Sequence, residues 1–490
     1  FNIFRAKSSE LANGDTGNWY AKKIATVYGS DTVFVDTAVE TFQSYYYRVT
    51  AFDSHLTNGT VYYNESWYSN SAFSGTIPLG PHTGKYWYVS SDTGNNIDYN
   101  GMSYAPFKTI AKAMSVVSSG DTICIAVGSY SEDITISQNN ISIIGAGSSG
   151  DSTAISGKVT ASNKSNILID KISILNVLTA NGDGINFTNI SNPRITNSKI
   201  YNVKRYGIYI DSCTNAYLFN NTLDSIPYHT IYVTGTSSVS SIDSNLLINC
   251  RYYGIYIDNN ANTNSITNNK VLNNRYSAMI INSKCNTIGN NYIYNVYNSY
   301  SGEGNGISIY GDSGYVYNNI CDSIYSAAIL VNANNILVDS NLVQGVMGSG
   351  ITIGNDKDSN SITNNILLNI AIKVSAAAIS TGAGSDSTII SGNNIYNISG
   401  SADGIIIYNG YNNYCYNNII DSVAQRGISV SFFSDYTNNI IDSNLIKNVN
   451  YGIEVSKFDL GFITRNRIIN CKYNGIKFTS NSDSNIVANN

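Results

Sequence analysis

The 490-residue sequence predicts an all-β solenoid, in which short strands stack turn upon turn. The stretch 441–478 states the same pattern twice: Ile441–Ile446 is echoed by Ile463–Ile468, and Tyr451–Val455 is echoed by Asn474–Phe478. Apolar residues alternate in each short strand, so one face points inward and the other outward. A unit this short cannot bury its apolar face alone, so it must stack on a copy of itself.

Two columns extend this repeat along the chain. A small residue followed by an apolar one recurs every 22 to 28 residues, at Gly184, Gly207, Thr230, Gly254, Ala278, Gly306, Ala328, Gly350, Ala378, Gly404, Gly427, Gly452 and Gly475. The second column begins with Ser198 and continues as Asn221, Asn245, Asn269, Asn291, Asn319, Asn341, Asn365, Asn393, Asn418, Asn444, Asn466 and Asn489. Asn tolerates the left-handed conformation and can form an amide ladder, and Gly or Ala suits a tight corner. The spacing predicts three short strands and their corners in each turn.

The first 84 residues form a separate predicted domain, a small β-sandwich of evenly spaced short strands. We expect these strands at Phe1–Arg5, Tyr20–Tyr28, Thr32–Asp36, Ser44–Asp53 and Ser71–Pro78. The succession FNIFRA, IATV, FVDTAV, YYYRVTAFDS and NESWYSN resembles the second part of a fibronectin type III domain. The resemblance implies that Phe1–Arg5 is strand C and that Tyr46–Arg48 belongs to strand F. Strands A and B have no counterpart, so either upstream residues or another chain would supply them.

Residues 85–490 form the second predicted domain, which opens with a helix over 105–117. Apolar residues recur there at helical intervals, and Pro106 stands near the start. The motif PFxTIxxA in this helix resembles the N-terminal cap of right-handed parallel β-helix proteins. The resemblance to this fold, of the carbohydrate-binding and sugar-hydrolase repeat type, extends to the end of the sequence. The last repeat stops at Asn490 without a polar cap, so we expect the chain to continue or its end to stack on another subunit.

Composition excludes several classes of function. Only 12% of residues are charged and the net charge is -5, which disfavours a nucleic-acid-binding protein. No apolar run is long enough to span a membrane. The seven Cys show no CxxC spacing and are expected to be small buried residues. Because the chain has only three His, we expect no His-rich zinc site. We expect no cofactor and no metal-binding residue, and leave a structural calcium ion open.

One outward face carries most of the candidate functional residues. The residue between the two inward positions is Tyr in three successive turns, and Arg, Tyr and His precede it. Stacked Tyr beside Arg suits sugar rings and uronic-acid carboxylates. Alternatively, these side chains only stabilise neighbouring turns by stacking and charge pairing. The candidate glycan-binding residues are Arg205, Tyr206, Tyr209, His229, Tyr232, Arg251, Tyr253, Tyr256 and Arg275.

The same face also carries candidate catalytic residues. Asp211 and Asp258 occupy equivalent positions two turns apart, about 9–10 Å from each other, which is at the upper edge for an inverting pair of carboxylates. The resemblance to β-helix pectate lyases and polygalacturonases implies a site on such a face. Their signatures are absent: there is no NTD with DD cluster, no GHG and no RxK following such a GHG. If the protein is an enzyme, Asp211 and Asp258 are the catalytic candidates; otherwise it has no catalytic residue.

The sequence therefore favours an extracellular structural or adhesive protein of the cell surface, a subunit of a sheath, surface layer or filament. The chain is similar in its Asn- and Tyr-rich composition to large surface proteins of archaea and bacteria. Self-association or other surface proteins are the expected partners, with polysaccharide as a further one. The alternatives are a polysaccharide lyase or glycoside hydrolase acting on an acidic glycan, and a non-catalytic glycan-binding adhesin.

Overall fold

The computed structural model describes residues 1–7, 22–27, 34–39, 44–57, 60–66, 72–76, 86–96, 101–103, 105–147, 152–179, 182–238, 240–297, 304–372, 377–431, 438–480 and 482–490. The chain divides into two compact units, Phe1–Thr83 and Gly84–Asn490. The predicted boundary at 84/85 lies outside the described residues. No helix of the described residues is long and apolar enough to cross a membrane.

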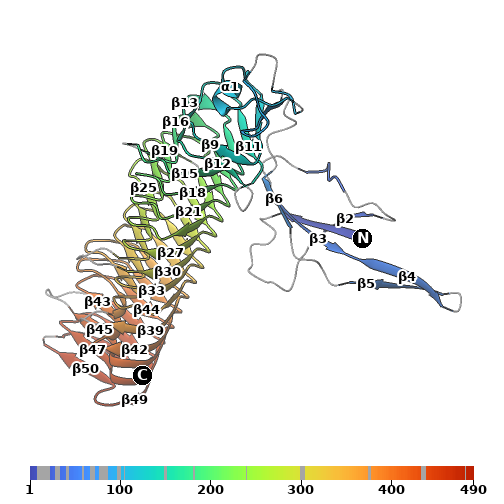
Figure 1. Ribbon diagram of the computed structural model, residues 1–490. Helices are drawn as coiled ribbons and strands as arrows, with labels where there is room; N and C mark the ends of the chain where they lie inside the picture. The colour runs from blue at the N-terminus through green and yellow to red at the C-terminus, as the bar shows by residue number, and fades with distance from the viewer. Residues whose placement is uncertain are drawn as a thin grey trace. The chain divides into compact units, whose positions relative to one another are not determined.

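The first unit contains one antiparallel sheet and one separate hairpin (Figure 1). The sheet has the order β2 (Lys22–Thr26), β1 (Asn2–Lys7), β3 (Ser44–Thr50) and β6 (Ala72–Thr76), and the hairpin joins β4 (Phe52–Thr57) to β5 (Thr60–Glu65). A second sheet facing the first, which a sandwich requires, is not found in the described part of this unit. The fibronectin type III resemblance therefore stays a prediction.

Two strand predictions in this unit differ from the structure in the described residues. Residues 34–39 form no strand, and the Asp36 carboxylate there accepts hydrogen bonds from Arg5 Nη1 and the Tyr47 hydroxyl, both at 2.8 Å. The predicted strand Ser44–Asp53 is interrupted at Ala51, whose N–H donates to the Ser66 hydroxyl at 2.8 Å instead of to a neighbouring strand. Side-chain bonds from a loop thus replace ladder bonds at both places.

The second unit is a parallel β-solenoid with about 14 turns over its described residues (Figure 1). Each turn contributes one strand to each of three stacked sheets, which we call A, B and C in chain order. Sheet A follows the column of small residues, and its strands are β10 (Ile134–Ile136), β13 (Val159–Ser165), β16 (Ile185–Ser191), β19 (Ile208–Asp211), β22 (Ile231–Thr234), β25 (Ile255–Ile257), β28 (Met279–Ile281), β31 (Ile307–Ile309), β34 (Ile329–Val331), β37 (Ile351–Ile353), β40 (Ala377–Ser380), β43 (Asp403–Tyr408) and β50 (Ile476–Thr479).

Sheets B and C complete each turn. Sheet B consists of β7 (Tyr86–Val89), β8 (Thr122–Ile125), β11 (Ser142–Gly145), β14 (Leu168–Asp170), β17 (Arg194–Thr196), β20 (Tyr217–Phe219), β23 (Ser241–Asp243), β26 (Ser265–Thr267), β29 (Thr287–Gly289), β32 (Tyr315–Tyr317), β35 (Leu337–Asp339), β38 (Ser361–Thr363), β41 (Ile389–Ser391), β44 (Tyr414–Tyr416), β46 (Ile440–Asp442), β48 (Phe462–Thr464) and β51 (Ile486–Ala488). Sheet C consists of β9 (Gly128–Tyr130), β12 (Thr153–Ile155), β15 (Ser173–Leu175), β18 (Lys199–Tyr201), β21 (Thr222–Asp224), β24 (Leu246–Ile248), β27 (Lys270–Asn274), β30 (Tyr292–Val296), β33 (Ile320–Ile324), β36 (Leu342–Gln344), β39 (Ile366–Ile372), β42 (Asn394–Gly400) and β49 (Arg467–Cys471). Two long strands, β45 (Ile419–Ser431) and β47 (Leu445–Ser456), run from sheet C into sheet A.

The core is a stack of branched apolar side chains inside the three sheets. In one turn Ile208 and Ile210 from sheet A meet Leu218 from sheet B and Leu223 from sheet C, and all four are fully buried. The alternating pattern of the sequence thus predicts the inward positions correctly. Four of the seven Cys, at 213, 250, 321 and 415, are buried in this stack as expected, whereas Cys285 is exposed.

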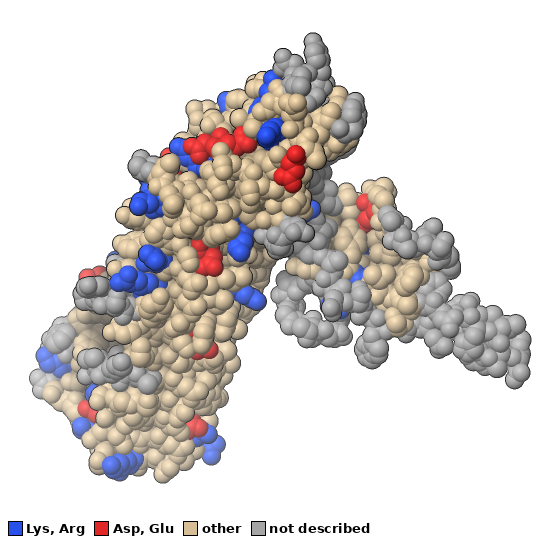
Figure 2. Space-filling model, in the orientation of Figure 1, with Lys and Arg blue, Asp and Glu red and all other residues tan. Residues whose placement is uncertain are grey.

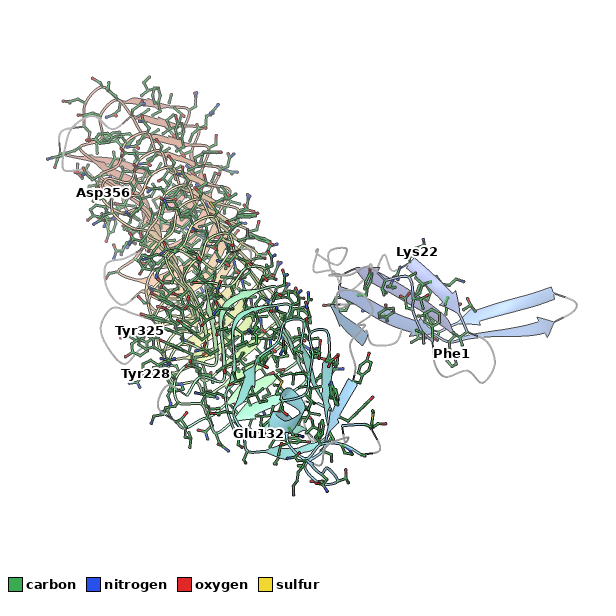
Figure 3. All side chains as sticks on the ribbon, turned by 90° about the horizontal axis from the view of Figure 1, so that it is seen from above. Phe1, Lys22, Glu132, Tyr228, Tyr325 and Asp356 are labelled. Atoms are coloured by element: carbon green, nitrogen blue, oxygen red, sulfur yellow. The ribbon has the colours of Figure 1, made fainter. Side chains whose placement is uncertain are left out.

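The capping helix is shorter than predicted. Helix α1 spans Ile110–Met114 and begins after its N-cap Thr109, not at residue 105. The preceding Phe107 is extended because its N–H donates to Tyr88 O and its carbonyl accepts from Ser90 N, each at 2.8 Å. The Glu132 carboxylate, labelled in Figure 3, accepts from Ile110 N at 2.8 Å and from Ala111 N at 2.7 Å. These bonds satisfy the first helical N–H groups and hold α1 against the entry turns.

Candidate functional site

The outward residues of sheet A form an aromatic cluster in the turns of β19, β22 and β25. Tyr209, Tyr232 and Tyr256 project between two inward apolar positions, and register pairs Tyr209 with Tyr232 and Tyr232 with Tyr256. Their rings meet edge to face at 5.3 and 5.2 Å between centroids. Parallel strands about 4.8 Å apart place these rings in contact without any loop insertion. Repetition of one residue type at one register position therefore builds the cluster.

A second row of rings precedes the strands. His229 lies between Tyr206 and Tyr256, with ring centroids 5.5 and 4.5 Å away and interplanar angles of 4° and 9°. Tyr253 also stacks on His229 at 5.2 Å, and Tyr252 lies tilted against it at 5.2 Å. The cluster therefore consists of Tyr206, Tyr209, His229, Tyr232, Tyr252, Tyr253 and Tyr256. Figure 3 labels Tyr228, which lies at the margin of this cluster on the outer edge of the solenoid in that view.

A groove of about 420 Å³ opens beside this cluster and runs over the following turns of sheet A. Its first half is lined by aromatic rings, and its second half by smaller polar and aliphatic side chains together with Tyr310. The lining residues are His229, Tyr232, Tyr252, Tyr253, Tyr256, Ser277, Ile280, Asn282, Asn305, Tyr310 and Leu330. The described part of the lining contains aromatic faces and amides but no carboxylate and no Lys or Arg.

Hydrogen bonds fix the tips of the tyrosines. The Tyr232 hydroxyl donates to Asp258 Oδ2 at 3.3 Å, and Asn282 Nδ2 donates to the Tyr256 hydroxyl at 2.9 Å. Burial raises the pKa of both phenols, and the Asp258 charge adds to this effect. Both rings are therefore neutral and held in place at physiological pH.

His229 is neutral at physiological pH. Burial lowers the pKa of its imidazole to about 4, although the nearby Asp258 charge opposes this shift. Its Nδ1 atom is buried and has no hydrogen-bond partner in the described structure. Both observations have the same cause, since neighbouring rings exclude water from the imidazole.

The predicted arginines do not all join the cluster. Arg205 donates from Nε and Nη2 to the two carboxylate oxygens of Asp183 at 2.7 and 2.6 Å, and it lies over the Tyr206 ring at 4.7 Å. Asp183 is buried, with a side-chain exposure of 2%. Arg275 lies over the Tyr276 ring at 5.9 Å, and Arg251 is exposed. The alternative function of charge pairing and stacking between turns thus accounts for Arg205.

The two candidate carboxylates occupy one column but have separate surroundings. Asp211 pairs in register with Thr234, and Asp258 follows one turn later. Asp258 accepts hydrogen bonds from Thr234 Oγ1 and Asn259 N, both at 2.8 Å. Asp211 accepts from Ser212 Oγ at 2.9 Å. Neither carboxylate belongs to the lining of the groove, so the two residues do not face each other across it.

The lining also contains residues outside the candidates named from the sequence, among them the polar residues Ser277, Asn282, Asn305 and Tyr310. Asn282 occupies the register position of Asp258 one turn later, and Tyr310 follows in the next turn. Extending the Asp211–Asp258 column past its last carboxylate would have found both. Asn305 and Ser277 bond to each other across turns, with Asn305 N donating to Ser277 Oγ at 3.2 Å.

No group of three or more His, Cys, Asp or Glu side chains that could hold a metal ion occurs among the described residues.

Solved structures with a similar course of the chain include three carbohydrate-related proteins. The A-module of the mannuronan C-5 epimerase of Azotobacter vinelandii is 14% identical, with a TM-score of 0.38, covering 75% of this chain and 90% of its own. An alginate lyase in complex with a trisaccharide is 12% identical, with a TM-score of 0.43, covering 72% of this chain and 86% of its own. The catalytic domain of an α-1,3-glucanase in complex with nigerose is 13% identical, with a TM-score of 0.36, covering 89% of this chain and 82% of its own. No curated protein sequence matches the chain.

The model of one protein family matches most of the sequence. This model describes a right handed beta helix region, and its matches cover residues 59–247, 130–293 and 373–490. The matched ranges contain the sheet A strands of the aromatic cluster and both ends of the Asn column. The chain belongs to the family of right-handed β-helix proteins.

Proposed function

We propose that this protein binds an extended carbohydrate chain in the groove of sheet A, as a non-catalytic glycan-binding protein. The observation that carries this proposal is the aromatic cluster around His229, which continues into a groove of about 420 Å³ lined by amides and tyrosines. Sugar rings present C–H faces that pack on aromatic rings, while their hydroxyls bond to amides and phenols. A groove that combines these two kinds of surface suits a carbohydrate.

The charge distribution supports binding without catalysis. Glycoside hydrolysis commonly needs two carboxylates on opposite sides of the scissile bond, about 5–10 Å apart. The described lining of the groove contains none, and Asp211 and Asp258 stand outside it. We therefore expect no release of reducing ends or unsaturated products from acidic or neutral polysaccharides. Cleavage that is abolished in Asp211→Asn or Asp258→Asn would replace this proposal with a polysaccharide lyase or hydrolase.

We further propose an extracellular, structural or adhesive setting for this binding. The low content of charged residues and the Asn- and Tyr-rich surface support it, and Figure 2 illustrates how sparse the charges are on one face of the solenoid. Self-association or contact with other surface proteins fits such a setting. An ordered assembly should bury well over ~1,000 Å² per contact. A strictly monomeric particle at high protein concentration would count against self-association.

The binding proposal is tested by removing one ring from the groove. Tyr256→Ala deletes a ring that stacks on His229, and we expect the Kd for a bound glycan to rise about tenfold, because one aromatic contact is worth about 1 kcal/mol or more. Tyr256→Phe keeps the ring and should retain most of the affinity. Tyr451→Ala, at a stacked pair near the other end of the solenoid, is the matched control. Equal affinities of the wild type and Tyr256→Ala would refute glycan binding at this groove.

A further inference from the structure

The groove is electrically neutral along its described lining. Ser277, Asn282 and Asn305 carry no charge. The lining tyrosines are phenols, and burial raises the pKa of Tyr232 and Tyr256. Among the lining residues, His229 has the ordinary pKa closest to neutrality. Tyr206 and Tyr256 stack on its imidazole, and burial lowers its pKa so that it is uncharged. A ligand in this groove therefore meets dipoles and π faces instead of cations.

The nearby cations are engaged or lie outside the lining. Arg205 forms a two-pronged ion pair with the buried Asp183 of the preceding turn, which neutralises its charge within the solenoid. Arg275 packs over the Tyr276 ring, and exposed Arg251 does not belong to the lining. An exposed cation in contact with water contributes little to binding at ordinary salt concentration.

Asp258 places a negative charge beside the aromatic half of the groove. Asp258 accepts a hydrogen bond from Tyr232, which lines the groove, and Asp258 also acts on the pKa of His229, Tyr232 and Tyr256 by its charge. A uronate carboxylate laid on these rings would lose its hydration without gaining a cation, and it would be repelled by Asp258. The groove therefore penalises an anionic sugar at its aromatic end.

We infer that the groove selects an uncharged polysaccharide and discriminates against uronic-acid polymers. This inference rests on the proposed glycan binding and names its substrate class. Neutral pyranoses place their C–H faces on the Tyr256 and Tyr232 rings. Their hydroxyls meet the Asn282 amide and the Tyr256 phenol, which accepts from Asn282 and keeps its own proton to donate. This inference departs from the Arg-based expectation of an acidic ligand, because Arg205 is paired with Asp183.

The test compares acidic polymers with neutral ones. Polygalacturonate and its fully methyl-esterified form share a backbone, and neutral glucan, mannan and galactan are run beside alginate and hyaluronan. Retention of the full chain in affinity electrophoresis is measured at about 50 and about 500 mM salt, which change charge screening strongly. We expect at least one neutral polymer to be bound tenfold or more tightly than every acidic polymer, with little dependence on salt. Preference for an acidic polymer, with binding lost at high salt, would overturn the inference.

Variants distinguish a failure of this inference from a failure of the proposed glycan binding. Arg251→Ala should leave retention by the neutral polymer unchanged, whereas Tyr256→Ala should abolish most of it, with thermal unfolding confirming that both variants fold. If Arg251→Ala and Arg275→Ala weaken binding more than Tyr256→Ala, cations recognise the ligand and the inference fails while glycan binding stands. If no polymer in the panel is retained, glycan binding itself fails.

Discussion

At the scale of single residues, His229 shows how an ordinary ionisable side chain becomes part of an aromatic stack. Tyr206 lies on one face, Tyr256 and Tyr253 stack on the ring, and Tyr232 meets it edge to face at 5.0 Å. Protonation would place a charge among rings that exclude water from Nδ1. The neutral imidazole therefore packs as one more aromatic ring of the cluster, although its ring nitrogens are polar.

This burial makes the stability of the protein depend on pH. The unfolded state binds a proton at His229 near pH 6.5, whereas the folded state binds it only near pH 4. The folded pKa is the lower one, so the stabilisation is complete above pH 6.5 and is lost as pH falls towards 4. The full loss amounts to roughly 3 kcal/mol.

Thermal or urea unfolding between about pH 7 and about pH 4.5 measures this loss. His229→Phe keeps a ring of similar shape and cannot titrate, so its stability should fall less over the same range. Parallel pH curves of the wild type and His229→Phe would contradict the buried, neutral imidazole. Carboxylates elsewhere in the chain titrate in both proteins and cancel in the comparison.

At the scale of structural elements, the corner between sheets B and C is held by an Asn ladder. Asn341 shows the pattern: its Nδ2 donates to Asn365 Oδ1 at 2.9 Å and to Val316 O at 3.0 Å, while its Oδ1 accepts from Asn319 N and Nδ2. The ladder residues are buried, so each amide replaces bonds that water cannot supply. The ladder therefore stabilises the corner and fixes its register.

The ladder predicts a sharp difference between a buried ladder asparagine and an exposed corner asparagine of the neighbouring turn. Asn341→Ala leaves the buried Asn319 N–H and amide without their acceptor, and we expect a loss of about 2–4 kcal/mol from the free energy of unfolding. Asn318→Gly is the matched control, because Asn318 is exposed and has a φ of 51°, which Gly adopts without strain. Urea unfolding measures both variants. Equal stability of Asn341→Ala and Asn318→Gly would contradict a structural role of the ladder.

The Asn column in the sequence predicted where the corner between sheets B and C lies, but not which residue performs which task there. Asn was expected to supply both the ladder and the left-handed corner, but the structure separates the tasks: Asn319 bonds, whereas Asn318 before it takes the positive φ. At the end of the column the ladder residue is Asn490, which accepts from Asn466 Nδ2 at 2.9 Å, and Asn489 is the left-handed one. A run of two Asn gives no sign of which member faces inward.

The column of small residues also has a different cause from the one expected. Gly452 does not have a positive φ in the structure. A Cβ there would lie 2.3 Å from Gly475 O and 2.6 Å from Ile468 Cγ2, so close approach of the next turn keeps this position small. The sequence showed that the residues of this column are small, but it did not show which atoms of the next turn lie against them. The sequence also predicted the row of tyrosines on sheet A, because they repeat at one register position. It did not predict the ion pair between Arg205 and Asp183, because that contact occurs once and follows no repeat.

At the scale of the whole solenoid, the groove extends over five successive turns of sheet A, from Tyr232 to Leu330. With about 4.8 Å per turn it covers about 19 Å, which exceeds the length of one sugar unit. Affinity should therefore rise with the length of an oligosaccharide and level off once the chain spans the groove. Calorimetry with a series of neutral oligosaccharides measures this dependence. The same affinity for a monosaccharide and for a long chain would contradict an extended binding groove.

The Asn ladder gives the solenoid an electrical direction. From Asn221 to Asn466 the side-chain amides that bond along the column donate towards the C-terminal neighbour and accept from the N-terminal one. Their dipoles therefore add along the axis, as peptide dipoles add in a helix. Damage to one amide is one-sided for the same reason: the turn before it loses an acceptor for two donors, while the turn after it keeps its own donors bonded. A fault in the corner should thus loosen the preceding turn first.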